Sequence, residues 1–259
     1  MFDLEGRVAL VSGAARGMGR AMSLALAEAG AALMLADRDL DGAEKTAAEI
    51  ASLGGRATAV ACDVADPLQI RAMFERLDRE FGRIDFLGNV AGEGFAGRPE
   101  EISLEDVEKS WRSLVYGRFC ACQEGGRRML AAGRGSIVNI GSLASVTALG
   151  RGHIAYSMAM GAVVQMTREL STEWSGRGVR VNAILPAQVV NPGLEARMAA
   201  DPNLRGKFLS GIPSGRLGKP DDIRGLAVLL ASDASAWITG ALIPMDGGNL
   251  AMNAGGSIP

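Results

Sequence analysis

The amino-acid sequence contains little cysteine, a single histidine and no long apolar run. Its three cysteines are an odd number and form no C-x-x-C pair, which favours reduced thiols packed in a core over a disulfide framework, a redox pair or a metal site. No apolar run approaches the roughly 20 residues that cross a membrane. The first residues contain neither the basic nor the apolar segment of a secretory signal, so we expect a cytoplasmic protein.

An excess of charge of one sign is also missing. The sequence has 27 lysines and arginines against 29 aspartates and glutamates, a formal net charge of −2, and no block of like charges. Because a nucleic-acid-binding surface needs a basic patch, we expect neither nucleic acid nor a membrane as a partner. With 259 residues, 48% of them hydrophobic, the chain is long enough for one large α/β domain over residues 1–259.

Strand-like apolar runs alternate with helical patterns along the chain. The pattern predicts strands at 8–11, 32–37, 57–61, 84–88, 136–140, 179–184 and 241–244. It predicts helices at 20–29, 41–53, 67–81, 104–130, 153–174 and 220–232, with a helical piece at 195–200 inside an otherwise irregular stretch. Strands that are apolar on both faces and separated by helices indicate a doubly wound parallel sheet, Rossmann-like, with about seven strands and helices on both sides.

The segment from Ser12 to Gly19 links the first predicted strand to the first helix. Its glycines, Gly13, Gly17 and Gly19, alternate with residues that include Arg16 and Met18. A glycine-rich turn at a helix start lets backbone N–H groups approach an anion, and the helix dipole favours negative charge there. The turn therefore predicts a phosphate site, although an ordinary strand–helix turn remains the alternative because the spacing is not the common G-x-G-x-x-G.

Asp37 ends the second predicted strand, about twenty residues after this turn. A dinucleotide site needs a carboxylate there to accept hydrogen bonds from the adenosine ribose. The same carboxylate repels the 2′-phosphate of NADP, so Asp37 favours NAD. Arg16 and Arg38 favour NADP more weakly, since either side chain is able to pair with a phosphate.

Ligands of such sheets bind beyond the carboxyl ends of the strands. Ser142 follows the fifth predicted strand, and Tyr156 lies near the start of the next helix. A tyrosine hydroxyl close to a serine hydroxyl is able to exchange a proton with a carbonyl or an alcohol, which beside a nicotinamide makes a hydride-transfer site. The alternative is a packed tyrosine whose hydroxyl is hydrogen-bonded within the core.

Taken with the stretches 136–142, 156–157, 180–184 and 245–248, these motifs resemble the short-chain dehydrogenase/reductase family over essentially the full chain. The resemblance implies a nicotinamide dinucleotide on the glycine turn and a catalytic pair of Ser142 and Tyr156. It also implies a homotetramer that pairs the helices 104–130 and 153–174. The further cofactor contacts that it implies are adenine contacts at Asp63 and Val64, a backbone role for Asn89, Ala91 and Gly92, and contacts from Tyr156, Pro186 and Val189 around the nicotinamide.

Two positions depart from the family pattern. Met160 stands where the family has a lysine, four residues after Tyr156, and Leu114 stands where it has an asparagine. A cation about 4 Å from a tyrosinate is worth on the order of 4 kcal/mol at an effective dielectric constant near 20, or roughly three pKa units. Since Met160 has no charge, alcohol oxidation should suffer most, because it needs a base. His153 is a candidate proton relay and Arg151 a weaker source of charge, and the alternative for His153 is a place at the pocket rim.

Residues 187–215 are expected to cover the substrate. The sequence leaves three functions open. The first is an NAD-dependent oxidoreductase acting on a small alcohol or ketone, with Tyr156 as acid and base. The second is a dinucleotide-binding protein without redox turnover, which acts as a sensor or as an inactive partner. The third is a non-redox enzyme that transfers protons and keeps the cofactor as structure.

Overall fold

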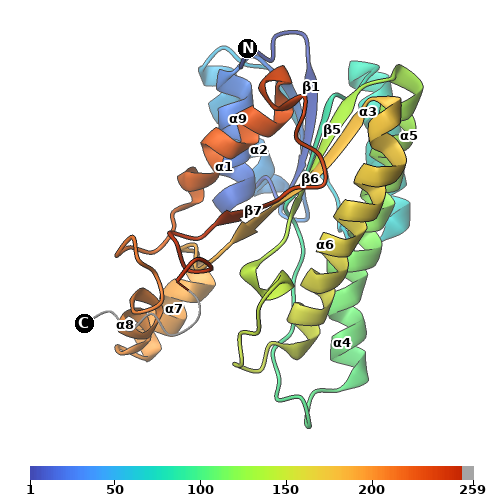
Figure 1. Ribbon diagram of the computed structural model, residues 1–259. Helices are drawn as coiled ribbons and strands as arrows, with labels where there is room; N and C mark the ends of the chain where they lie inside the picture. Colours follow the sequence, from blue (N-terminus) through green and yellow to red (C-terminus); the bar gives the residue numbers. More distant parts are fainter. Residues whose placement is uncertain (253–259) are drawn as a thin grey trace.

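The computed structural model describes residues 1–252, which include a seven-stranded parallel sheet in the order β3-β2-β1-β4-β5-β6-β7 (Figure 1). Every neighbouring pair of strands in it is parallel. The strands are β1 Val8–Ser12, β2 Ala32–Asp37, β3 Ala57–Ala61, β4 Phe86–Asn89, β5 Gly135–Ile140, β6 Val179–Pro186 and β7 Leu242–Met245. This architecture confirms the predicted doubly wound fold.

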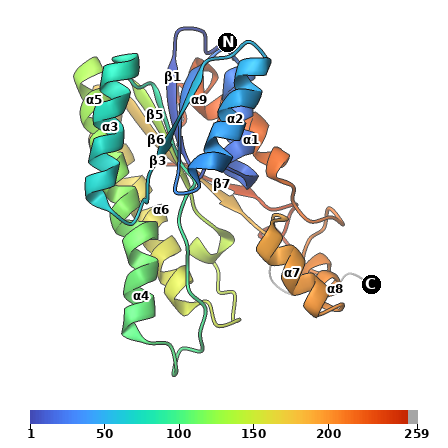
Figure 2. The ribbon, with the colours of Figure 1, turned by 180° about the vertical axis from the view of Figure 1, so that it is seen from behind.

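Helices cover both faces of the sheet (Figures 1 and 2). On one face lie α1 Gly17–Glu28, α2 Leu40–Ser52 and α9 Arg224–Ala231. On the other lie α3 Pro67–Phe81, α5 Arg118–Ala132 and α6 Ile154–Trp174. Three further helices, α4 Leu104–Trp111, α7 Pro192–Ala200 and α8 Leu204–Leu209, lie beyond the end of the sheet that is opposite the N-terminus.

The strands are apolar on both sides because both sides are covered. In β1, Ala9 and Val11 pack into the core on the α1 side, whereas Val8 and Leu10 pack into the core on the α3 side. Successive side chains of a strand point to opposite faces, so a strand between two helical layers must be apolar throughout. The continuous apolar runs of the sequence follow directly from this double burial.

The order of the strands reverses next to β1. After β1 the chain builds β2 and β3 on one side and then returns to add β4 to β7 on the other. The loops that follow β1 and β4 therefore diverge at the carboxyl edge and leave a crevice between them, which is where sheets of this kind bind ligands.

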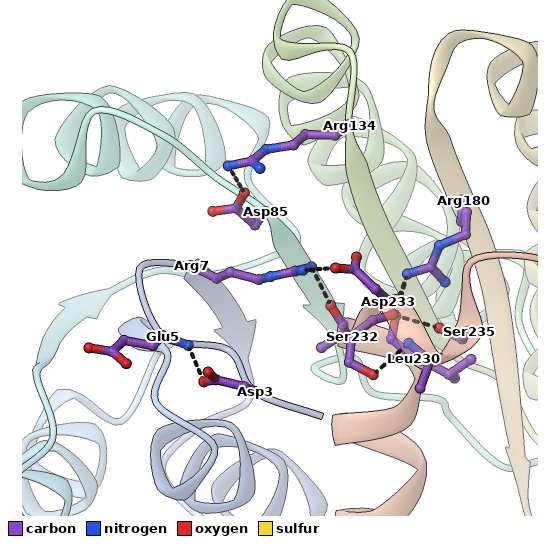
Figure 3. A network of polar contacts seen from close by, with 12 residues as sticks. Asp3, Glu5, Arg7, Asp85, Arg134, Arg180, Leu230, Ser232, Asp233 and Ser235 are labelled. Carbon is purple, nitrogen blue, oxygen red and sulfur yellow. Dashed lines mark hydrogen bonds and ion pairs between the residues drawn. The ribbon is translucent and has the colours of Figure 1, made fainter. Parts of the chain in front are cut away.

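The opposite edge of the sheet is tied together by polar contacts (Figure 3). Arg7 pairs with Asp233 at 2.5 Å, and Arg134 pairs with Asp85 at 3.3 Å. Arg180 donates to the backbone carbonyl of Leu230 at 3.0 Å. These contacts fix the amino ends of the strands, while the loops at the carboxyl ends are left to form the site.

Several predicted boundaries need correction. The helix predicted at 104–130 is interrupted by a π-helical segment, Arg112–Gly117, between α4 and α5. The first helix begins at Gly17 rather than near Arg20, because the end of the glycine turn is already helical. The stretch after residue 200, expected to be irregular, contains α8. The helix expected from His153 begins at Ile154, and the fourth strand begins at Phe86.

Candidate functional site

A cleft of about 490 Å³ lies at the carboxyl ends of β1, β2, β3 and β4. It brings together ten of the residues that the sequence analysis names as cofactor contacts: Gly13, Arg16, Met18, Gly19, Asp37, Arg38, Asp63, Val64, Ala91 and Gly92. Its remaining wall comes from the ends of β3 and β4 and from the α4 region: Cys62, Ala65, Val90, Glu93, Phe95, Lys109, Arg112 and Ser113. The α4 residues carry no motif, so the sequence analysis missed them.

The β1–α1 turn is shaped for the close approach of a ligand. Gly13 has a φ of +73°, which side-chain-bearing residues rarely adopt, and a Cβ there would lie 3.1 Å from the backbone nitrogen of Ala91. Its N–H donates to Ala36 at 2.8 Å, which ties the turn to β2. The side chain of Arg16, the residue before α1, does not cap the helix. The first N–H groups of α1 are therefore available to an anion such as a pyrophosphate.

Asp37 is held by backbone groups on both of its carboxylate oxygens. Oδ2 accepts from the Ala15 N–H at 3.0 Å, and Oδ1 accepts from the Asp39 N–H at 3.0 Å. Each oxygen keeps a second lone pair for a ribose hydroxyl. Beside it, Arg38 pairs with Glu93 at 3.1 Å, so an exposed ion pair joins the end of β2 to the loop after β4.

Ser12 holds the loop after β4 in place. Its Oγ accepts from the N–H groups of Val90 and Ala91 at 3.1 and 3.2 Å. Asn89 lies beneath this loop and not on the cleft wall, because its buried amide donates to Asn139 Oδ1 at 3.0 Å. Asn139 in turn donates to Thr167 of α6 at 3.0 Å. Asn89 thus supports the loop from below through a buried chain of polar side chains.

Ser142 and Tyr156 lie on the β5 side of the same edge. Ser142 follows β5, and its Oγ accepts from the Ala144 N–H at 3.1 Å as the cap of the 3₁₀ turn Leu143–Ser145. Tyr156 lies in the first turn of α6, which packs against that 3₁₀ turn. Since β5 is the neighbour of β4, the two hydroxyl-bearing residues flank the cleft without lining it.

The ring of Tyr156 lies under the loop that follows β4. Gly94 of this loop approaches so closely that a Cβ there would be 2.6 Å from Tyr156 Cδ2. The His153 ring meets the Tyr156 ring edge to face, with 6.4 Å between the ring centroids. Its Nδ1 lies 2.7 Å from the Arg151 carbonyl oxygen. The Arg151 guanidinium itself lies 5.1 Å from the centroid of the Phe208 ring in α8, and burial lowers its pKa.

The two positions that depart from the family pattern belong to one apolar cluster. Leu114 and Met160 are 2% and 1% exposed, and both pack in a cluster that also receives the side of Tyr156. The π-helical segment carries Leu114 into this cluster. The surroundings of Tyr156 on this side are therefore apolar.

Arg118 is a buried cation that the sequence analysis missed. Its side chain is 4% exposed, and its Nη1 and Nη2 donate to the carbonyls of Ile140 and Ala91 at 2.7 and 3.1 Å. Burial lowers the pKa of its guanidinium to about 10, while Cys122 and Tyr156 act in the opposite direction. The only signal in the sequence is an arginine on the apolar face of a helix, four residues after Leu114.

The segment after β6 forms a wall at the far end of the edge. Pro186 ends β6, and Val189 forms an isolated bridge with Gly218. Asn191 then caps α7 by accepting from the Leu194 N–H at 3.0 Å. A second cavity of about 380 Å³ includes Gln188 and Ser214 among its lining residues. The segment predicted to cover the substrate thus lies beside a cavity of its own.

Residues 1–252 contain neither a membrane-spanning helix nor a cluster of metal-binding side chains. None of the helices in this part of the chain is long and apolar enough to cross a membrane. Within the same residues, no group of three or more histidine, cysteine or acidic side chains is arranged to hold a metal ion.

The known proteins to which this chain is similar belong to one family. A family model described as Enoyl-(Acyl carrier protein) reductase matches residues 13–249. The chain is 44% identical to D-threitol dehydrogenase of Mycolicibacterium smegmatis, over 95% of this chain and 94% of that protein. It is 37% identical to galactitol 2-dehydrogenase (L-tagatose-forming) of Cereibacter sphaeroides, over 96% of each. The crystal structure of a gluconate 5-dehydrogenase from Burkholderia cenocepacia J2315, in complex with NADP and tartrate, superimposes with a TM-score of 0.91 at 32% identity, over 96% of this chain and 98% of that chain.

Proposed function

The chain belongs to the short-chain dehydrogenase/reductase family and is an oxidoreductase, and from this premise we propose that it transfers hydride between NAD(H) and a secondary alcohol of a small polyol, or the matching ketone. The observation that carries the proposal is the position of Ser142 and Tyr156 at the strand edge next to the dinucleotide cleft. The names of the threitol and galactitol dehydrogenases support a polyol as the substrate class.

The residues of the cleft fit a nicotinamide dinucleotide. The uncapped start of α1 suits the pyrophosphate, and Asp37 suits the hydroxyls of the adenosine ribose. Asp63 and Val64 just after β3 suit the adenine, and the backbone at Ala91 and Gly92 leads to Gly94, which approaches the Tyr156 ring. When bound, the nicotinamide accepts or supplies the hydride. The contacts expected from Gly17, Pro186 and Val189 remain predictions.

The protein's own part in the reaction is to bind the substrate oxygen and move its proton. Because the Ser142 Oγ already accepts from the Ala144 N–H, its own O–H is left to donate to the substrate oxygen. The Tyr156 hydroxyl donates a proton to that oxygen in reduction and takes one from it in oxidation. The loop carrying Gly94 covers the Tyr156 ring and limits its movement.

NAD is the proposed cofactor. The Asp37 carboxylate accepts hydrogen bonds from a ribose hydroxyl but repels a 2′-phosphate. Arg38, which would attract such a phosphate, is paired with Glu93. Because the related gluconate 5-dehydrogenase was crystallised with NADP, turnover with NADP must be measured alongside turnover with NAD.

The test is a turnover assay with threitol, galactitol and their ketones, using both nucleotides and following the absorbance of the reduced nicotinamide. We expect turnover with NAD, and a loss of about 100-fold or more in Tyr156→Phe with unchanged binding of NAD. Ser142→Ala should also lower kcat, because the substrate oxygen loses a donor. Full activity in Tyr156→Phe would remove the tyrosine from the mechanism.

A second function, dinucleotide binding without redox turnover, is favoured by the apolar packing of Leu114 and Met160 beside Tyr156. An apolar environment disfavours the ionised phenol that alcohol oxidation requires. Calorimetric binding of NAD, together with no turnover on a broad panel of alcohols and ketones, would support this alternative.

We also propose a cytoplasmic homotetramer. Tyr116, Phe119 and Met158 are exposed apolar side chains on the π-helical segment, α5 and α6, the helices expected to pair between subunits. The three cysteines are buried as free thiols, which suits a reducing compartment. Light scattering behind a gel-filtration column would give the mass; a monomeric mass contradicts the tetramer.

A further inference from the structure

Arg118 holds a fixed charge below the cleft. It is the first residue of α5, and its guanidinium bridges the carbonyls of Ile140 and Ala91 at 2.7 and 3.1 Å. These carbonyls lie at the carboxyl ends of β5 and just beyond β4, the two strands between the dinucleotide cleft and the catalytic pair. The arginine thus connects the loops on either side of the reacting centre.

The charge of Arg118 is buried without a full counter-charge. Within residues 1–252 its Nε has no hydrogen-bond partner, and no carboxylate there forms an ion pair with it. Two carbonyl oxygens offset only part of the cost of removing a cation from water. Since its pKa is about 10, the guanidinium is nevertheless protonated at neutral pH. An anion that forms nearby would therefore stabilise the buried charge of Arg118.

Tyr156 is the acidic group able to provide that anion. The Arg118 guanidinium and the Tyr156 ring lie against the same loop: a Cβ at Gly92 would be 3.6 Å from Arg118 Nη2, and a Cβ at Gly94 would be 2.6 Å from Tyr156 Cδ2. Cys122, one turn further along α5, is the other acidic group near this cation. Burial raises the pKa of the Cys122 thiol to about 12, so this thiol stays neutral. The phenol of Tyr156, by contrast, must become a phenolate for alcohol oxidation in the proposed function.

The other elements around Tyr156 bring little charge. On α6 itself, Met160 is apolar, and the π-helical segment contributes Leu114. The loop before α6 brings the His153 ring and Arg151, whose guanidinium lies over the Phe208 ring of α8, and the β5 end brings the Ser142 hydroxyl. The loop after β4 brings Gly94, while Glu93 in the same loop pairs with Arg38.

We infer that Arg118 supplies the positive charge that the apolar residue Met160 does not, and that it stabilises the phenolate of Tyr156 from beneath the site. The inference rests on the proposed function. In oxidation, the hydride leaves the alcohol carbon for the nicotinamide and the alcohol proton passes to the Tyr156 oxygen. Arg118 forms and breaks no covalent bond. It is a positioning residue, and its planar guanidinium is held rigidly by two carbonyls.

The direct test measures the ionisation of Tyr156 without turnover. The chain contains only two tyrosines, so the ultraviolet difference between the wild type and Tyr156→Phe isolates the Tyr156 phenolate. We expect Arg118→Met to move the midpoint of that titration to higher pH, and Arg118→Lys to move it less. An unchanged midpoint in Arg118→Met would overturn the inference.

Arg180→Met is the matched control. Arg180 also donates to backbone carbonyls, those of Leu230 and Ser232 at 3.0 and 3.2 Å, but at the opposite end of the sheet (Figure 3). Arg180→Met should lower the melting temperature and leave the midpoint of the Tyr156 titration unchanged. An equal shift in Arg180→Met would mean that loosening of the fold, and not the charge of Arg118, moves the titration.

Turnover gives a second readout. Arg118→Met should slow alcohol oxidation at neutral pH by about tenfold or more, with a loss that shrinks as the pH rises, and should slow carbonyl reduction less. Adding Met160→Lys to this variant should restore oxidation, and no recovery would count against the inference. An equal loss at every pH would also contradict it. If the wild type turns over no polyol with either nucleotide, the proposed function fails, while the titration still decides the role of Arg118.

Discussion

We expect Asp37 to select the nucleotide through a single charge. Both of its oxygens accept backbone N–H groups, so the carboxylate is fixed at the end of β2. Asp37→Asn keeps the size of the side chain and an acceptor oxygen but removes the charge. We expect the ratio of kcat/KM for NADP to that for NAD to rise by about tenfold, which corresponds to about 1.4 kcal/mol.

Steady-state kinetics with the two nucleotides at a fixed substrate concentration check this expectation. Asp37→Ser serves for comparison, because it removes both the charge and the carboxylate oxygens that accept from the N–H groups of Ala15 and Asp39. An unchanged ratio in Asp37→Asn would mean that charge at this position does not select the nucleotide.

Gly94 determines where the Tyr156 ring lies. A Cβ at position 94 would be 2.6 Å from Tyr156 Cδ2 and 3.1 Å from Tyr156 Cβ, so either the ring or the loop must shift. We expect Gly94→Ala to lower kcat by about tenfold or more, since a displacement of about 1 Å at a reacting group is costly. NAD affinity should change little, because Gly94 does not line the cleft.

Gly225→Ala provides the control for this substitution. Gly225 lies in α9, where a Cβ would meet nothing within 4 Å, so alanine there should leave kcat unchanged and stabilise the helix by about 0.5–1 kcal/mol. Kinetics and thermal melting of the two variants separate the effects. Wild-type turnover in Gly94→Ala would show that the Tyr156 ring is not confined by this loop.

Single residues also show where sequence reasoning ends. The positions of Ser142 and the glycine turn at the carboxyl edge were predictable because each follows a strand, and that of Tyr156 because it lies near the start of the next helix. Arg118 was not, because an arginine in a helix is usually solvated and nothing in its local pattern marks it as buried. Its burial follows from the packing of α5 against β4 and β5, which is a tertiary property.

At the scale of elements, a change in helix type escapes a pattern of apolar residues. The sequence from 104 to 130 is periodic throughout, but the structure divides it into α4, the π-helical segment and α5. The wider turn adds about one residue without breaking the run of helix, so periodicity gives no sign of it. It nevertheless sets which way Leu114 and Arg118 point, and hence the surroundings of Tyr156.

A buried chain of side chains connects three elements below the site. Asn89 of β4 donates to Asn139 of β5, which donates to Thr167 of α6 at 3.0 Å. Thr167→Val keeps the shape of the side chain but leaves the Asn139 amide without its acceptor. We expect the free energy of unfolding to fall by about 1–3 kcal/mol, the cost of an unpaired buried polar group.

Thr172→Val is the matched control on the same helix. Thr172 is exposed and its hydroxyl bonds only to the carbonyl one turn earlier, that of Arg168, so valine there should change stability by less than about 0.5 kcal/mol. Urea unfolding of both variants measures the difference. Equal stabilities would show that the buried chain contributes nothing to the fold.

At the scale of the whole molecule, the fold was the most predictable property. Each strand is apolar on two faces because two helical layers cover the sheet, so the alternation of elements and the composition of the strands indicate one architecture. Which residues line the cleft from separate elements, such as Ser113 and Gly13, depends on the assembled layers. No local pattern contains that information.

Burial in this core also gives the stability of the molecule a dependence on pH. Cys122 is fully buried, and burial raises its thiol pKa from the ordinary value of 9.0 to about 12. The folded state thus holds this proton more tightly. The resulting stabilisation is complete below about pH 9 and is lost as the pH rises toward 12, by up to about 1.4 kcal/mol per pH unit.

Comparison with Cys122→Ala isolates this effect. Two other buried groups also change the stability with pH. Arg118 stabilises the fold as the pH rises above about 10, because its lowered pKa lets the buried guanidinium lose its charge there. Cys62, whose thiol pKa is raised to about 12 by burial and by Asp63, destabilises the fold at high pH as Cys122 does. Cys62 remains in the variant and cancels in the difference, whereas Arg118 cancels only in part, because the charge of Cys122 itself raises the Arg118 pKa. Between pH 8 and pH 10, urea unfolding at one protein concentration should show the wild type losing about 1.4 kcal/mol more than Cys122→Ala. Parallel losses in the two proteins would mean that the Cys122 thiol ionises in the folded state as readily as in the unfolded chain.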